Sequence, residues 1–133
     1  MRLSVVLDCA DPAALVPFWA EAMGYRLATS LPGFEVLVPR AEEPEGPVFI
    51  LQRVPEDKQG KNRMHLDVHV PLDIGVPEQA SRLVGLGARR VGAPVMELWQ
   101  TAEIWWQVMA DPEGNEFCLV ADPGHPAPPD GWT

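Results

Sequence analysis

The order of apolar and polar positions predicts that the first half of the chain folds as a strand, a helix and three further strands. Residues 3–9 are rich in β-branched and apolar side chains, as expected for a strand. Residues 12–23 carry apolar side chains at helical spacing, with Asp11 before them as an N-cap and Gly24 after them as a stop signal. Shorter strand-like runs follow, separated by turn-forming residues, at 25–29, 34–38 and 48–53.

The same order of elements recurs after a polar stretch at residues 55–63, which we interpret as a surface linker. Residues 64–70 alternate as a strand, and residues 77–86 have a helical pattern that ends at Gly87. Strand-like runs then return at 88–95, 103–110 and 116–121. The two helices end in glycine at nearly the same offset, so the second half repeats the first as βαβββ.

This repeat predicts an α+β fold built from two tandem βαβββ modules, with the helices outside. Module one covers residues 1–54 and module two covers residues 64–121. Two independent domains of this size would each be marginally stable, so we expect a single domain over residues 1–121. Residues 122–133 are rich in proline and are expected to be extended and irregular.

Composition and charge exclude several classes of function. Apolar residues make up 47% of the 133 positions and charged residues 22%, which is typical of a globular protein. The net charge of −9 argues against a nucleic-acid partner, because phosphate binding needs clustered Lys and Arg. The sequence has neither a membrane-length apolar run nor a signal-peptide pattern, so we expect a cytoplasmic protein without a membrane partner. Cys9 and Cys118 lie in apolar runs and are expected to be buried free thiols.

The first candidate site is the polar face of the strand predicted at 64–70. His65, Asp67 and His69 alternate along it, so their side chains point to the same side. If the sheet curls so that this face lines a cavity, these groups can bind a cation or a polar ligand. A solvated edge strand is the alternative for Asp67 and His69, and His65 is the better candidate.

The second candidate is Glu116, the first residue of an apolar strand. The preceding Asp-Pro-Glu-Gly sequence at 111–114 is typical of a tight turn. The tight turn accounts for residues 111–114, but it does not account for a carboxylate as the first residue of a core strand. Glu116 is therefore either a solvated edge residue or a ligand.

Adjacent tryptophans supply a third candidate. Trp105 and Trp106 must face opposite sides of their predicted strand, so one is expected in the core. The other can enter the cavity and stack on a planar or cationic ligand. In the alternative interpretation both are core or dimer-contact residues.

These features together resemble the glyoxalase/bleomycin resistance/dioxygenase superfamily, also called the vicinal oxygen chelate superfamily. The resemblance covers residues 3–121 and is closest to small bacterial glyoxalase-like domains. It rests on the βαβββ repeat, a strand beginning with His65 after the linker, Leu-Gly-Ala at 86–88 and Asp-Pro-Glu-Gly-Asn-Glu-Phe at 111–117. It also implies curved mixed sheets around a cavity and a homodimer, and we expect the C-terminal tail with Trp132 to cover the partner.

The resemblance further implies where a metal would bind. In metal-using members each module supplies one ligand from its first strand and one from its last. These positions are His65 and Glu116 in the second module, and Ser4 and Val48 in the first. Valine cannot bind a cation and a serine hydroxyl is a poor ligand, so too few donors remain for tight binding. We expect no tightly bound cofactor, with a divalent metal at His65 and Glu116 as the alternative.

The resemblance and these residues together imply two main functions. The first is a small-molecule-binding protein in which His65, Asp67, Trp105 and Trp106 contact a planar or cationic organic ligand without a tightly held metal. The second is a metal-dependent lyase, isomerase or dioxygenase that uses His65 and Glu116 as ligands, with Glu116 as the catalytic base. A regulatory domain that binds a metabolite is also compatible with the fold.

Overall fold

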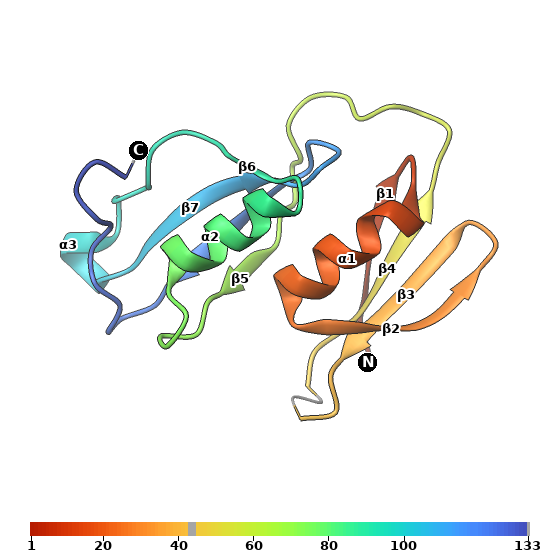
Figure 1. The fold of residues 1–133 in the computed structure, drawn as a ribbon, viewed down its shortest axis with the longest axis horizontal. Coiled ribbons are helices and arrows are strands. Elements are labelled where there is room, and N and C mark those ends of the chain that lie inside the picture. The colour runs from red at the N-terminus through yellow and green to blue at the C-terminus, as the bar shows by residue number, and fades with distance from the viewer. Residues whose placement is uncertain (43–44, 133) are drawn as a thin grey trace. The chain divides into compact units, whose positions relative to one another are not determined.

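The computed structural model describes residues 1–42 and 45–132, and it confirms the predicted α+β fold with two βαβββ modules (Figure 1). The modules form two compact units, Met1–Gln59 and Gly60–Thr133. None of the helices in the described ranges is long and apolar enough to cross a membrane.

The first module forms a mixed sheet covered by one long helix. Its strands lie in the order β1-β4-β3-β2, with β1 parallel to β4 and the other pairs antiparallel. The elements are β1 (Ser4–Cys9), α1 (Pro12–Met23), β2 (Tyr25–Leu31), β3 (Phe34–Pro39) and β4 (Val48–Arg53).

Helix α1 begins and ends at the predicted residues. The Asp11 side chain accepts a hydrogen bond from the backbone N–H of Ala14 at 3.2 Å, and Gly24 adopts the left-handed conformation that glycine tolerates best. The buried face of the helix packs on the sheet, where the rings of Trp19 and Phe49 lie 5.1 Å apart. The hydrophobic core of this module therefore lies between α1 and one face of its sheet.

The second module repeats this plan. Its sheet has the order β5-β8-β7-β6, again with a parallel first pair and antiparallel neighbours. Leu83 of the helix and Phe117 and Leu119 of the sheet are fully buried. The elements are β5 (Asp67–His69), α2 (Val76–Gly85), β6 (Arg89–Arg90), α3 (Trp99–Ala102), β7 (Trp105–Ala110) and β8 (Glu116–Ala121).

The strand predicted at 64–70 is shorter than expected. Bends over residues 60–64 precede it, although the carbonyl of Leu66 still accepts a hydrogen bond from the Cys118 N–H at 2.9 Å. His65 therefore lies just before β5 rather than within it.

The strand predicted at 88–95 is also shorter. It contributes β6 and a separate bridge between Val95 and Trp106. Between them lie Gly92, with a φ of 73°, and Pro94, which has no N–H to donate to a ladder. The sequence pattern did not predict helix α3, and α2 begins and ends one residue earlier than expected.

The C-terminal tail packs on its own module instead of standing free. Among residues 122–132, none lies in a helix or strand, as predicted. The carbonyl of Pro126 accepts a hydrogen bond from the Trp105 indole at 2.9 Å. The Trp132 ring meets that of Trp105 edge to face, and the Arg90 guanidinium lies 3.7 Å from the centre of the Trp132 ring. The Trp132 ring therefore packs against residues of its own chain.

The turn between β7 and β8 is built around a buried carboxylate. Oδ1 of Asp111 accepts hydrogen bonds from the backbone N–H groups of Glu113 and Asn115 at 2.9 and 2.8 Å. The Asn115 side-chain amide also donates to the same carboxylate. Gly114 takes a φ of 88° in the turn. These contacts fix the direction in which Glu116 enters β8.

We predict that Asp111→Ala lowers the free energy of unfolding by about 2–3 kcal/mol, because buried N–H groups lose a charged acceptor. Urea unfolding followed by tryptophan fluorescence measures this change. Asp57→Ala, in the exposed linker, is the matched control and should change stability by less than about 0.5 kcal/mol. Equal midpoints for the two variants would contradict the structural role of Asp111.

Candidate functional site

The pairing of β5, β8 and β7 brings polar and aromatic side chains to the face of the second sheet opposite α2. Asp67 is aligned with Cys118, and Cys118 with Val108. Residues aligned across a sheet point to the same side, so these three side chains form one row. A second row contains His69, Val120 and Trp106.

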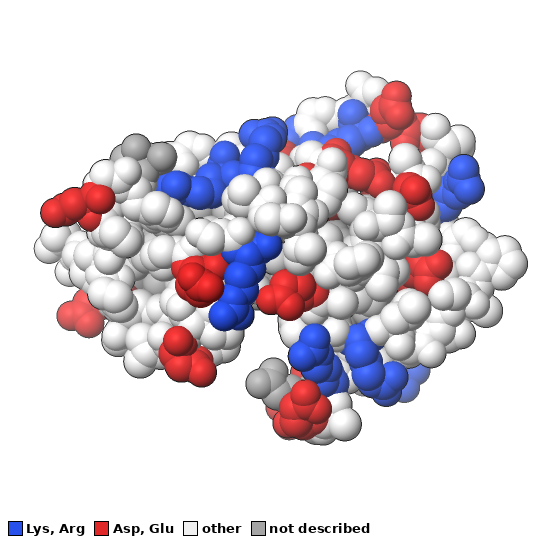
Figure 2. Space-filling view, in the orientation of Figure 1, with Lys and Arg blue, Asp and Glu red and all other residues white. Residues whose placement is uncertain are grey.

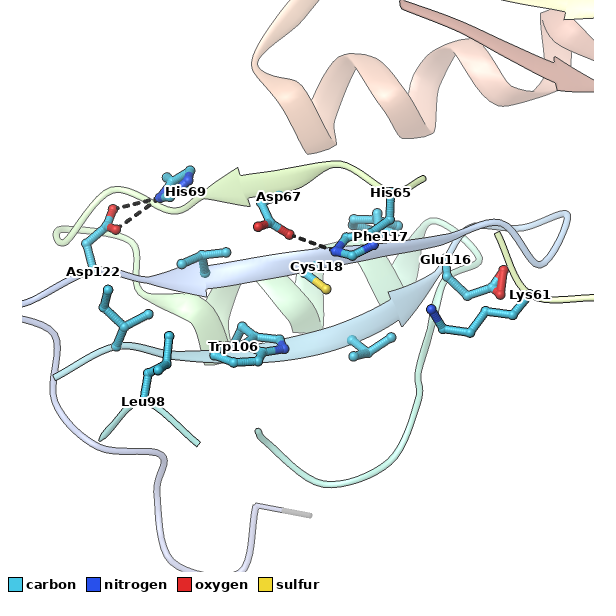
Figure 3. A pocket seen from close by; sticks show the side chains of 13 residues that line it. Lys61, His65, Asp67, His69, Leu98, Trp106, Glu116, Phe117, Cys118 and Asp122 are labelled. Carbon is cyan, nitrogen blue, oxygen red and sulfur yellow. Dashed lines mark hydrogen bonds and ion pairs between the residues drawn. The ribbon is translucent and has the colours of Figure 1, made fainter. Parts of the chain in front are cut away.

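A pocket of about 460 Å³ lies on this face (Figure 3). Its apolar wall is formed mainly by β7, β8 and the segment around α3, and its polar wall by β5 and the segment before it. The lining residues are Lys61, His65, Asp67, His69, Leu98, Ile104, Trp106, Val108, Glu116, Phe117, Cys118, Val120 and Asp122.

Each histidine in the pocket contacts a carboxylate. His65 Nε2 lies 3.3 Å from Asp67 Oδ1, and His69 Nδ1 lies 3.0 Å from both carboxylate oxygens of Asp122 (Figure 3). These side chains are 41% to 59% exposed. Each carboxylate orients the ring that it contacts, and at His69 the contact leaves Nε2 for a ligand or a proton.

Glu116 lies at the opposite end of the pocket from Asp122 (Figure 3). It begins β8, an interior strand flanked by β5 and β7, so it is not an edge-strand residue. The backbone N–H of Asn62 lies 3.4 Å from both of its carboxylate oxygens. Lys61 lies at the same end of the pocket.

Cys118 is a buried free thiol, as predicted, and it also lines the pocket. Only 5% of its surface is exposed, and its sulfur points into the pocket (Figure 3). The pKa of the Cys118 thiol is raised to about 11, mainly by burial and also by the charge of Asp67 and a hydrogen bond to Asp67, while Lys61 acts in the opposite direction. The spacing of two from Glu116 was the available signal, because it places both side chains on one face of β8.

Cys118, His65 and Asp67 together could hold a metal ion. One ligand atom from each residue lies within 4.8 Å of those of the other two. The group differs from the expected His65 and Glu116 set, since it uses Asp67 and a thiol in place of Glu116.

The two adjacent tryptophans have different environments. Trp106 lines the pocket, whereas Trp105 is 1% exposed on the other face and donates to Pro126. Direct contact with a ligand in this pocket is thus available to Trp106 and not to Trp105.

The first-module positions Ser4 and Val48 are aligned directly with each other in β1 and β4. Extending the β5–β8 register by two residues puts His65 opposite Glu116 in the same way. The four positions therefore correspond by structure as well as by sequence repeat. Val48 has no donor atom for a cation, so this set does not fit the metal centre of metal-using members.

The sequence profile of the glyoxalase-like domain family matches residues 4–120. The chain belongs to the glyoxalase-like domain family. Comparison of this glyoxalase-like domain with functionally characterised proteins gives no significant match.

Solved structures with the same fold come from several bacteria. A glyoxalase/bleomycin resistance/dioxygenase family enzyme from Burkholderia phytofirmans has a TM-score of 0.66 at 19% identity, covering 91% of this chain and 98% of its own. A fosfomycin resistance protein from Listeria monocytogenes, in complex with manganese(II) and sulfate, has a TM-score of 0.67 at 14% identity and covers 91% of both chains. A protein from Agrobacterium tumefaciens has a TM-score of 0.68 at 21% identity, covering 93% of this chain and all of its own. At these identities the similarity establishes the fold of the glyoxalase-like domain.

The raised pKa of Cys118 predicts slow alkylation at neutral pH. In a Cys9→Ser background, the rate with iodoacetamide should rise about tenfold per pH unit between about pH 7 and about pH 9 without a plateau, because the thiolate is still a minor species there. Mass spectrometry measures the modified fraction. Asp67→Asn should accelerate the reaction at fixed pH, because it removes a nearby negative charge. A plateau in the folded protein near the ordinary thiol pKa of about 8.5 would contradict this prediction.

Proposed function

We propose that this glyoxalase-like domain binds a small organic molecule with a planar or cationic group in the pocket of the second module, through contacts that need no metal. The observation that carries the proposal is the presence of the Trp106 indole and several carboxylates in one pocket. Its volume of about 460 Å³ lies within the range of about 300–1,000 Å³ typical of small-molecule sites.

The apolar part of the pocket supports binding of a planar group. Leu98, Ile104 and Val108 line it together with Trp106. An indole that stacks on a planar or cationic group contributes about 0.5–2 kcal/mol. Few polar groups in a mostly apolar wall are typical of a site that orients its ligand.

The charges in the pocket favour a cation over an anion. Among the described residues that line it, the carboxylates of Asp67, Glu116 and Asp122 outnumber the ammonium group of Lys61. An anionic ligand would meet negative charge that this lysine only partly offsets. The chain as a whole carries a net charge of −9, and on the face drawn in Figure 2 the Lys and Arg side chains lie among acidic and uncharged residues. We infer a small-molecule partner rather than a nucleic acid.

A metal-dependent lyase, isomerase or dioxygenase is the second candidate function. One support is the β5–β8 register, which when extended places His65 opposite Glu116. The other is the manganese(II) held by the Listeria protein of similar fold. In this reaction class the metal would polarise vicinal oxygens of the substrate, while His65 and Glu116 would hold it. The weakness of this candidate is the donor set, since Val48 and Ser4 occupy the other two positions.

Fluorescence titration with cationic aromatic compounds tests the first proposal. Binding should quench tryptophan emission, and Trp106→Phe should remove most of the quenching. Trp106→Ala should weaken binding by about 2- to 30-fold, the equivalent of the stacking energy. Trp99→Phe is the matched control, because Trp99 lies outside the pocket lining and its loss should leave affinity unchanged. Equal effects of the two phenylalanine variants would contradict the proposed site.

Salt dependence and metal dependence separate the two candidates. The affinity for a cationic compound should fall as ionic strength rises from about 0.01 M to about 1 M, over which the Debye length shrinks from about 30 Å to about 3 Å. Binding of anionic, metal-chelating compounds alone, and only with an added divalent metal, would refute metal-free binding and support the enzyme.

A further inference from the structure

The pocket brings together three different metal-binding groups that come from two neighbouring strands. His65 and Asp67 belong to β5 and the residues just before it, and Cys118 belongs to β8. The β5–β8 register aligns Asp67 directly with Cys118, and His65 lies two positions earlier on the same face. An imidazole, a carboxylate and a thiol therefore converge because of backbone pairing.

The distances are suitable for a small cation. His65 Nε2 and Asp67 Oδ1 lie 3.3 Å apart. Two ligands at about 2.0–2.1 Å from a tetrahedral ion are separated by about 3.3–3.4 Å, so this pair already has the spacing of one edge of the tetrahedron. The Cys118 sulfur completes a group whose ligand atoms all lie within 4.8 Å of one another.

The position of the Cys118 sulfur determines what kind of metal site can form. Cys118 is buried on its own strand, yet its sulfur points into the pocket beside the more exposed His65 and Asp67 (Figure 3). A cation bound there would have protein ligands on one side and the open pocket on the other. Three protein ligands with an open fourth position is the arrangement of exchangeable or catalytic sites rather than of closed structural ones.

The donor types select the metal. A thiolate is a soft ligand that favours zinc or cobalt over magnesium or manganese. The first-module positions that correspond to Asp67 and Cys118 are Val6 and Ile50, which offer no donor atom, and Ser4 corresponds to His65, so the three-donor group belongs to the second module.

We propose that His65, Asp67 and Cys118 form a three-ligand site for a thiophilic divalent cation such as zinc. His65 binds through Nε2, Asp67 through a carboxylate oxygen and Cys118 as a thiolate, whose proton passes to solvent on binding. Glu116 stays outside the coordination sphere. This site shares His65 and Asp67 with the proposed organic-ligand pocket, but metal binding does not depend on that ligand.

Cobalt(II) absorption tests the ligand set. Titrating the full-length protein with cobalt(II) should produce a thiolate-to-cobalt charge-transfer band that saturates at one equivalent. Cys118→Ser should remove the band and weaken zinc binding by at least about 100-fold, since even the loss of a second-shell partner costs about 10- to 100-fold. Cys9→Ser is the matched control, and it should keep both the band and the affinity. Absence of the band in the unmodified protein, or its persistence in Cys118→Ser, would overturn the proposal.

Two further variants separate this site from the family positions. Asp67→Asn should weaken zinc binding, whereas Glu116→Gln should leave it unchanged. The reverse result would place the metal at His65 and Glu116 and overturn the proposal. Manganese(II) should fail to displace cobalt(II) at equal concentration, and displacement would equally count against a thiolate ligand.

X-ray absorption on the zinc-loaded protein gives a test that needs no variant. It should show one sulfur at about 2.3 Å and lighter ligands at about 2.0–2.1 Å from zinc. A shell of nitrogen and oxygen alone would overturn the proposal even if the Cys118→Ser protein fails to fold. Loss of organic-ligand binding without loss of the cobalt band would reject the proposed function and leave the metal site standing.

Discussion

The parallel pairing of β5 with β8 is the constraint on which the candidate site depends. Because residues aligned across a sheet point to the same side, the register of Asp67 with Cys118 decides which side chains face the pocket. A shift of β8 by one residue against β5 would turn the thiol of Cys118 toward α2 and bring the core residues Phe117 and Leu119 to the open face. Burial of those core side chains therefore holds the chemical groups in register.

The two modules use one backbone plan with different side chains on the open face of the sheet. In the first module, Val6 and Ile50 occupy the positions that Asp67 and Cys118 occupy in the second. The packing of each helix against its sheet involves the opposite face, so substitutions on the open face leave the core intact. Both modules can therefore keep the same fold even though only one of them carries ligand-binding groups on its open face.

Helical and strand periodicity predicted the βαβββ repeat, the bounds of α1 and the strand that begins at Glu116. The same periodicity placed His65, Asp67 and His69 on one face, where they line the pocket. These features depend on the spacing of nearby residues, which can be read directly from the sequence.

Features that depend on pairing between distant segments could not be predicted in the same way. Cys118 lies in a run that is apolar after Glu116, and such a run does not show by itself which face is open; only the spacing of two from Glu116 indicates the face of Cys118. The contact of His69 with Asp122 requires the path of the tail. The run at 88–95 is interrupted at Gly92, which has a positive φ, and at Pro94, which has no backbone N–H. The apolar pattern of that run does not indicate either effect.

The parallel pair also has a consequence for folding. Strands β5 and β8 are neighbours in the sheet, but in the sequence they are the first and last elements of the second module. Every other element of that module comes between them in the chain. Contacts between segments so far apart in sequence carry a high loop-closure cost, so they form late and slow the folding of a domain. The wall of the pocket that contains Asp67 and Cys118 cannot exist before this step. Any molecule that recognises both strands therefore distinguishes a completely folded module from one in which only the local hairpin of β7 and β8 has formed.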